Sequence, residues 1–251
     1  MSGLSELVNA LLLLYRRPTY LEVGVWDGGT FMAVEAARKV AVDVAFLFDV
    51  GAAGRAQPHC AFHQMPSDRY FGEIAGGVAE FDLILLDGLH TFEQTLRDLL
   101  NAAERLKPQG LIVIDDVRPD SELAALPSQE EAIARRDAGE PWDRHWMGDV
   151  YRLVYFIDSF MQGWTYRITT DLGQLIMWRQ ARQRVPDRRV EAVAQLSYAA
   201  MLERSEVFRP TPLDQIRADA ADALGLRVHV PWTADRVIAG VKRRLPASAR
   251  D

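Results

Sequence analysis

Apolar runs alternate with helical patterns from about residue 19 to residue 116, and this alternation limits the fold more than any other feature of the chain. The strand-like runs are residues 19–26, 42–51, 59–65, 81–88 and 111–116. Helical spacing follows the first run at 30–40 and the fourth run at 91–106. Strands that alternate with helices predict βαβ units, and therefore a parallel sheet with right-handed crossovers.

Composition excludes several classes of protein. The 251 residues suit one large domain or one domain with an appendage, and 49% of them are hydrophobic. A net charge of −6 argues against a nucleic-acid partner, which would need a basic face. No run reaches the ~18 apolar residues of a membrane span, so no membrane partner is expected. Cys60 is the single cysteine, which excludes an internal disulfide and favours a cytoplasmic location.

The pattern changes beyond the fifth strand. Residues 117–148 are polar and contain prolines, and they are too long for a plain connection, so they predict a lid or substrate loop. Helical spacing returns at 149–161, where Asp149 is expected to cap the helix that follows it. Residues 164–179 predict two strands joined by a tight turn. The region 186–251 is helical in pattern and is expected either to cover the sheet or to pair two subunits as a homodimer.

Ligands of open parallel sheets bind at the carboxyl ends of the strands. The first such end is the loop 22–29, whose glycines permit a sharp turn and a close approach to a ligand. Its glycine spacing does not fit the dinucleotide pattern, and Glu22, two residues before Gly24, suits a cationic ligand. Asp49 follows the second strand and is placed to accept hydrogen bonds from ribose hydroxyls. The alternative is that Glu22 and Asp49 only cap turns.

The fourth strand leads into a short loop that contains an acid and an imidazole, Asp87 and His90. Thr91 is expected to cap the following helix, and Gln94 three residues later completes a capping-box pattern. His90 therefore sits just outside the helix, at the ligand end of the sheet.

A pair of acids, Asp115 and Asp116, ends the fifth strand, which is an expected neighbour of the fourth. If they converge with Asp87, the three carboxylates repel and raise one another's pKa. A divalent cation removes that conflict, and all-oxygen ligands favour a hard ion such as Mg²⁺. Such an ion lowers the pKa of a bound hydroxyl, and His90 can then take the proton. In the alternative, the acids only cap turns and His90 bonds a backbone carbonyl.

Four stretches occur in the order "YLEVGVWDGGTF", "PSDRYF", "FDLILLDGLHTFEQTLRDLLNAAERLKPQGLIVIDDVRP" and "WMGDVYR". Together they resemble class I S-adenosylmethionine-dependent methyltransferases of the branch called methyltransferase domain 24, over roughly residues 19–180. The resemblance implies a Rossmann-like, doubly wound α/β fold, with a seven-stranded sheet that is mostly parallel and has its last strand antiparallel. It implies a methyltransferase domain at 1–185 and leaves a helical C-terminal extension at 186–251.

The resemblance also implies which residues bind S-adenosylmethionine. By similarity, Glu22, Gly24 and Gly28 would line its methionine part, Asp49 would hold the ribose, Ser67 and Asp68 would lie near the adenine, and Asp87 would lie beside the cofactor.

The acids resemble those of metal-dependent sugar O-methyltransferases of macrolide and aminocoumarin biosynthesis. In that group, an Asp after strand four and a pair of acids after strand five hold Mg²⁺, and Asp87, Asp115 and Asp116 match them. Some members carry an Asp as base two residues after the metal-binding Asp, where this chain has Leu89. Others use a His three residues after it, which His90 matches.

These similarities imply transfer of a methyl group to a hydroxyl of a sugar or other small natural product, with Mg²⁺ and with His90 as general base. His145, with Trp142 and Trp146, would form a substrate wall, or would only pack the loop on the core. Two alternatives stay open: a metal-independent small-molecule methyltransferase of the same fold, and a non-catalytic cofactor-binding protein.

Overall fold

The computed structural model describes residues 3–74, 81–140, 145–171, 173–183 and 189–231. Its strands are β1 (Thr19–Val23), β2 (Arg38–Asp43), β3 (Cys60–Gln64), β4 (Phe81–Leu86), β5 (Leu106–Ile114), β6 (Trp164–Thr169), β7 (Leu175–Arg179) and β8 (Pro210–Thr211). Its α-helices are α1 (Gly3–Leu12), α2 (Gly29–Ala33), α3 (Val50–Ala56), α4 (Ser67–Arg69), α5 (Phe92–Arg105), α6 (Gln129–Asp137), α7 (Tyr151–Phe160), α8 (Tyr198–Glu203) and α9 (Leu213–Leu224).

The strands form one mixed sheet in the order β3-β2-β1-β4-β5-β7-β6-β8. Strands β1 to β5 pair in parallel, whereas β7 is antiparallel to both β5 and β6. The predicted α/β class and the antiparallel hairpin at 164–179 are confirmed. The described sheet has eight strands where seven were expected, because the two residues of β8 add an edge beside β6.

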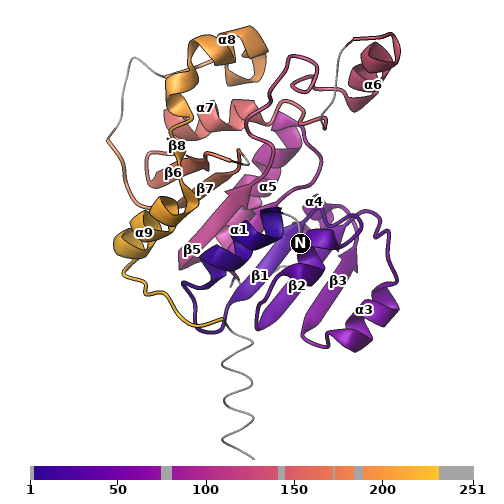
Figure 1. Cartoon of the computed structure of the whole chain (residues 1–251), viewed down its shortest axis with the longest axis vertical. Helices are drawn as coiled ribbons and strands as arrows, with labels where there is room; N and C mark the ends of the chain where they lie inside the picture. Colours follow the sequence, from indigo (N-terminus) through magenta and orange to yellow (C-terminus); the bar gives the residue numbers. More distant parts are fainter. Residues whose placement is uncertain (1–2, 75–80, 141–144, 172, 184–188, 232–251) are drawn as a thin grey trace, which may run out of the picture.

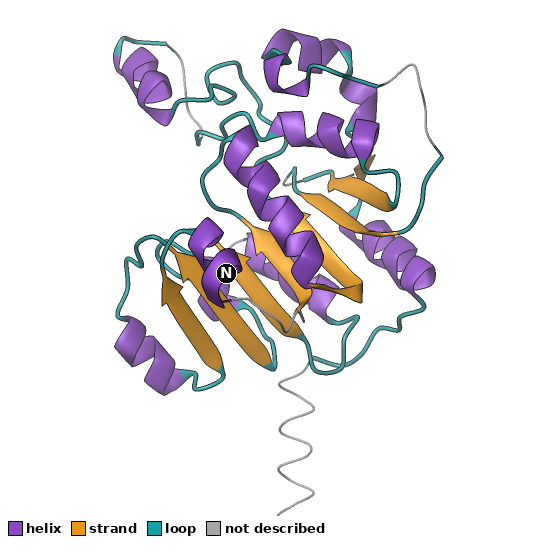
Figure 2. Cartoon of the chain, turned by 180° about the vertical axis from the view of Figure 1, so that it is seen from behind, coloured by secondary structure: helices purple, strands orange, loops and turns teal. Residues whose placement is uncertain are grey.

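Two layers of helices cover the sheet, as expected for a doubly wound fold (Figures 1 and 2). Side chains alternate along β4, so that Leu83 and Leu85 join one apolar core and Ile84 and Leu86 join the other. The first core includes residues of α1, α2 and α9, and the second includes residues of α5 and α7. Burial on both faces explains why the strands read as nearly continuous apolar runs in the sequence.

The prediction of a helix at 30–40 followed by a strand at 42–51 was wrong in its boundaries. Helix α2 ends at Ala33, and β2 already begins at Arg38. At this helix end Lys39, which is 1% exposed, donates from Nζ to the carbonyl oxygens of Phe31 (2.7 Å) and Val34 (3.0 Å), and Asn9 Nδ2 donates to Ala33 O (3.0 Å). These bonds satisfy carbonyls that would otherwise continue the helix, so the chain turns into the sheet four residues earlier.

The C-terminal region packs on the same sheet. Residues of 190–208 contribute to the core beneath α7, and α9 contributes to the core beneath α1. The described part of 186–251 is mostly short helical turns and irregular chain, with α8 and α9 as its α-helices. This region therefore covers the sheet, one of its two expected roles, and the domain boundary at residue 185 and the homodimer stay predictions.

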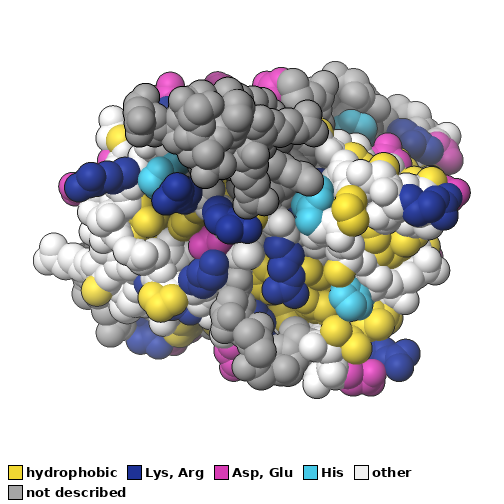
Figure 3. All heavy atoms as spheres, turned by 90° about the horizontal axis from the view of Figure 1, so that it is seen from below, with side chains coloured by type: hydrophobic (Ala, Val, Ile, Leu, Met, Phe, Trp, Pro, Cys, Tyr) yellow, Lys and Arg dark blue, Asp and Glu magenta, His cyan; other side chains and the backbone are white. Residues whose placement is uncertain are grey.

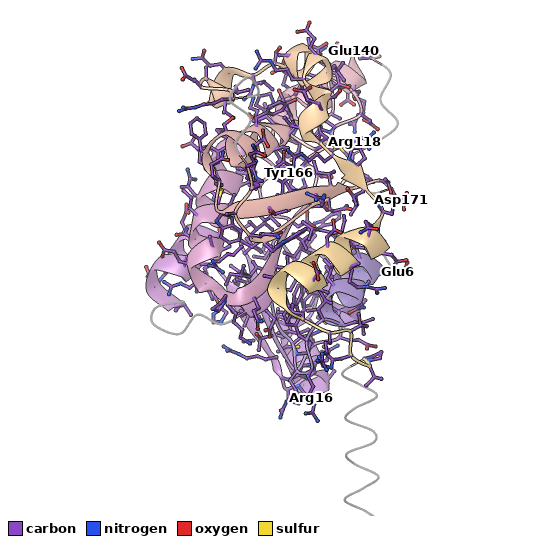
Figure 4. All side chains as sticks on the ribbon, turned by 90° about the vertical axis from the view of Figure 1, so that its left-hand side faces the viewer. Glu6, Arg16, Arg118, Glu140, Tyr166 and Asp171 are labelled. Carbon is purple, nitrogen blue, oxygen red and sulfur yellow. The ribbon has the colours of Figure 1, made fainter. Side chains whose placement is uncertain are left out.

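The two ends of the parallel strands lie at opposite ends of the molecule. Arg16, which precedes β1, is at one end, and Glu140, which follows α6, is at the other (Figure 4). The end near Arg16 shows basic side chains among hydrophobic ones (Figure 3). None of the described helices is long and apolar enough to cross a membrane.

Candidate active site

A cleft of about 790 Å³ opens at the carboxyl ends of the central strands. The loops after β1, β2, β3, β4 and β5 line it, together with His145 and Trp146. Of the sequence-predicted residues, the cleft contains Glu22, Gly24, Ser67, Asp87, His90 and Asp116. Gly28, Asp49, Asp68 and Asp115 are not among the residues that line it.

The loop after β1 approaches the loop after β4 at Gly24. This residue has φ +84°, and a Cβ there would lie 1.9 Å from the carbonyl oxygen of Asp87. Only glycine fits, because both the left-handed backbone and the contact exclude a side chain. Two residues later, Trp26 has φ +48°, a conformation uncommon for a non-glycine residue, and is 67% exposed at the mouth of the cleft.

Glu22 is a buried acid in this cleft, only 1% exposed. Its Oε2 accepts a 2.5 Å hydrogen bond from the Tyr20 hydroxyl. Burial raises the pKa of Glu22 well above its ordinary value, and the nearby Asp87 carboxylate raises it further. A positively charged ligand would restore the ionised form, so this carboxyl suits a cation, as the sequence indicated.

The acid at the end of β2 is Asp43, and not Asp49. Asp49 is instead the N-cap of α3, where its Oδ1 accepts from Ala52 N at 2.8 Å. Asp43 lines the cleft, and its Oδ2 accepts from the backbone amides of Val25 (2.6 Å) and Trp26 (2.8 Å). The predicted end of the strand was wrong, because β2 ends at Asp43 and Asp49 lies beyond a further loop, while the ribose role of Asp49 stays a prediction.

The loop after β3 meets helix α5 through Gln94. Gln94 Nε2 donates to Ser67 Oγ (3.2 Å), to Asp68 Oδ1 (3.4 Å) and to Asp98 Oδ1 (3.2 Å). Asp98 was not singled out from the sequence, yet it is 3% exposed and lines the cleft. Burial raises the pKa of Asp98. Thr91 Oγ1 does accept from Gln94 N (3.4 Å), so the predicted N-cap is confirmed, while the Gln94 side chain turns away from a capping box.

His90 lies between two carboxylates. Its Nε2 is 3.2 Å from Asp87 Oδ1, and its Nδ1 is 2.7 Å from Asp116 Oδ2, an ion-pair contact that is too bent for a hydrogen bond. The side chains of His90 and Asp116 are each 18% exposed, and both line the cleft. The two carboxylates overcome the effect of burial and raise the pKa of His90 to about 10. His90 is therefore an imidazolium at neutral pH.

The third acid, Asp115, lies behind this pair. Its Oδ1 accepts from Gln174 Nε2 (2.8 Å) and from Asp116 N (2.9 Å). Burial raises the pKa of Asp115 to about 8, and the charges of Asp87 and Asp116 add to that rise. The expected convergence of the three acids and His90 is therefore present.

The arrangement of these acids is not that of a metal centre. No group of three or more His, Cys, Asp or Glu side chains in the described part of the chain is placed to hold a metal ion together. His90 supplies positive charge between Asp87 and Asp116, where the metal hypothesis requires a cation. The donor types suit Mg²⁺, but the geometry does not fit it, so no step below depends on a metal.

The polar segment that precedes α7 also lines the cleft. The Trp146 ring stacks on the His90 imidazole, with centroids 5.9 Å apart, and its Nε1 donates to Leu126 O at 2.6 Å. Within this segment, α6 occupies Gln129–Asp137, and Gln129 also lines the cleft. Trp142 lies outside the described residues.

Asp149 does not cap the helix that follows it, so that prediction was wrong. Helix α7 has Val150 at its N-cap position, with no side-chain cap. The Oδ1 atom of Asp149 accepts instead from Phe92 N, at the start of α5, at 2.6 Å. The sequence could not show this contact, because 57 residues separate the two partners.

Part of the sequence matches a known protein family. Residues 21–117 match a family model described as a methyltransferase domain. Residues 21–117 are therefore similar to a methyltransferase domain. This match confirms the predicted family and enzyme class over those residues. A search of curated proteins finds no match.

Solved structures similar to this methyltransferase fold include TomG from Streptomyces achromogenes, an O-methyltransferase involved in tomaymycin synthesis, in complex with S-adenosylmethionine. It shares 17% identity, with 72% of this chain and 81% of that chain covered and a TM-score of 0.48. An O-methyltransferase from Bacillus cereus, in complex with S-adenosylhomocysteine, shares 13% identity. The comparison covers 70% of this chain and 80% of that chain, with a TM-score of 0.45. MycE, a methyltransferase of the mycinamycin pathway in complex with Mg, S-adenosylhomocysteine and mycinamycin VI, shares 13% identity. The comparison covers 72% of this chain and 55% of that chain, with a TM-score of 0.45.

The raised pKa of Asp115 predicts a pH dependence of stability. Asp115 ionises near pH 3.8 when unfolded and near pH 8 when folded, so its contribution is complete below pH 3.8 and lost as the pH rises through 8. We expect Asp115→Asn, which keeps an acceptor for Gln174, to lose less thermal stability than wild type between pH 5 and 9. Each kcal/mol of this difference in stability should shift Tm by roughly 2–4 °C.

Thermal unfolding followed by circular dichroism measures this difference. Asp214→Asn, on the exposed face of α9, is the control and should follow the wild-type curve. Parallel curves for Asp115→Asn and wild type would show that Asp115 does not keep its proton in the folded protein.

Proposed function

We propose that the protein is an S-adenosylmethionine-dependent O-methyltransferase that methylates a hydroxyl of a small molecule, such as a sugar or another natural product. One observation carries the proposal: a buried acid suited to a cation and the Asp87–His90–Asp116 cluster face the same cleft of a methyltransferase domain. The first can hold the charged cofactor, and the second can hold and deprotonate an acceptor.

The cofactor would lie along the carboxyl ends of β1, β2 and β3. Glu22 offers its carboxylate to the positive charge of the methionine part. Asp43 takes the ribose role first expected of Asp49, because a carboxylate can accept about four hydrogen bonds and backbone amides use three here. The adenine of the cofactor would reach Ser67, whose hydroxyl oxygen already accepts a hydrogen bond from Gln94.

The acceptor would enter between the two walls of the cleft. Trp26 and Trp146 both line the cleft, and aromatic faces stack well on sugar rings and planar molecules. His90, on which the Trp146 ring stacks, lines the same cleft, and its side chain is 18% exposed. This placement supports a small acceptor whose hydroxyl contacts the imidazole.

The reaction forms a bond between the acceptor oxygen and the methyl carbon and breaks the bond between that carbon and the sulfonium sulfur. The hydroxyl proton must leave, and His90 can accept it only as neutral imidazole. Asp87 and Asp116 oppose that form, because they raise the pKa of His90. Much of the remaining acceleration would come from holding oxygen, carbon and sulfur in line.

Replacing Glu22 tests the cofactor site. We expect Glu22→Gln to weaken S-adenosylmethionine binding by about 10- to 100-fold, since a hydrogen bond to a charged group contributes about 1.5–3 kcal/mol. Wild-type affinity should also fall as the pH falls, because protonation of Glu22 removes its charge, and the variant should lose this dependence. Isothermal calorimetry measures both effects, with Glu203→Gln on α8 as the control.

The pH profile of turnover tests His90. In EDTA and with saturating cofactor, we expect turnover to rise by about tenfold per pH unit from pH 7 to pH 9, because the neutral fraction of His90 rises by that factor. His90→Ala should lose this rise and most of its turnover while S-adenosylmethionine affinity stays near that of wild type. A flat wild-type profile would remove His90 as the base, and a wild-type protein that binds the cofactor without turnover would favour the non-catalytic alternative.

Magnesium assistance stays a separate hypothesis, supported by the oxygen donors of Asp87, Asp115 and Asp116 but not by their arrangement. It predicts that EDTA lowers turnover, that added Mg²⁺ restores it, and that Asp116→Asn abolishes the response. Equal rates in EDTA and in Mg²⁺ would leave the metal-independent methyltransferase.

A further inference from the structure

The segment 145–152, outside the matched domain, holds the His90 loop through its backbone. Gly148 has φ +64°, and a Cβ there would lie 1.6 Å from the carbonyl oxygen of His90. The backbone of residue 148 therefore lies directly against that of His90, and any side chain would force the two apart.

Asp149 adds a hydrogen bond beside this contact. It is 5% exposed, and its Oδ1 accepts from the amide of Phe92, the first residue of α5, at 2.6 Å. That amide has no partner within its own helix, and a carboxylate is further favoured at the positive end of a helix. Because Phe92 is two residues after His90, this bond fixes the end of the loop that carries the imidazole.

Asp149 is itself held from the C-terminal region. Its Oδ2 pairs with Arg152 Nη1, and Arg152 Nε donates to Leu196 O at 2.9 Å. The Tyr151 hydroxyl donates to the same carbonyl oxygen at 2.8 Å. A continuous set of contacts therefore connects Leu196, through Arg152 and Asp149, to the start of α5.

The neighbouring residues are anchored as well. The amides of Met147 and Gly148 both donate to Ala124 O, at 3.0 and 2.9 Å. Trp146 stacks on the His90 ring and is fixed at its other end by its bond to Leu126. The segment is therefore a fixed support for the loop.

We propose that Asp149 is a positioning residue, which acts through the Phe92 amide to keep His90 between Asp87 and Asp116. Arg152 and Leu196 keep Asp149 in place, so the C-terminal region supports the catalytic loop. The consequence for turnover rests on the proposed function, whereas the consequence for the loop does not.

Hydrogen exchange measured by mass spectrometry tests the effect on the loop without turnover. We expect Asp149→Ala to raise exchange in peptides that cover residues 87–95 by tenfold or more, because the Phe92 amide loses its acceptor. Asp149→Asn keeps an acceptor oxygen and should restore most of the protection. Asp214→Ala is the matched control, since it breaks another Asp–Arg pair with three-residue spacing, on α9, and should leave peptides 87–95 unchanged.

Kinetics supply the second readout. Asp149→Ala should lower kcat by tenfold or more, with S-adenosylmethionine affinity within about twofold of wild type and recovery in Asp149→Asn. Unchanged exchange at 87–95 in Asp149→Ala, or in Gly148→Ala if the first variant does not fold, overturns the proposal. Equal loss in Asp149→Asn and Asp149→Ala also overturns it. If wild type transfers no methyl group, the proposed function fails while exchange still decides the positioning role.

Discussion

The carboxyl end of β4 is enclosed by two glycines, and the rest of the site depends on this contact. Gly24 lies against the carbonyl oxygen of Asp87, and Gly148 lies against that of His90. A shift of the loop toward either glycine would produce steric overlap, so its two functional side chains leave from a nearly fixed backbone. Preorganisation of this kind costs conformational entropy at the glycines and reduces the reorganisation needed when a ligand binds.

Charge explains why an imidazole belongs in this loop. Asp87, Asp115 and Asp116 place three carboxyl groups close together, and the chain offsets their repulsion in two ways. His90 carries a proton between two of them, and Asp115 keeps its own proton up to about pH 8. The two protons lower the net charge of these four groups from −3 to −1 without a metal ion, and any ligand cation that enters must compete with the imidazolium of His90 for the same carboxylates.

The sequence predicted the features that depend on strand order. Once a parallel sheet was inferred, the carboxyl ends of two neighbouring strands had to meet, so the convergence of Asp87, His90 and Asp116 followed. Asp43 was missed because β2 was predicted too late in the chain, and no periodicity reveals the bonds that Lys39 makes to the carbonyls of Phe31 and Val34 where the preceding helix ends. Asp43 follows Gly24 at close to the ~20-residue spacing at which ribose-binding acids occur, and this spacing could have singled it out as a candidate.

Asp149 was misread for a different reason, and the reason bears on how the cleft is built. Local rules assign an acid to the nearest helix start, but its partner lies 57 residues earlier. Contacts of this range join two parts of the chain with different tasks. The proposed cofactor side comes from 22–67, inside the matched domain, whereas Gln129, His145 and Trp146, which also line the cleft, lie outside it. The position of the His90 loop therefore depends on contacts with Gly148, Asp149 and Leu196 that lie outside the matched domain.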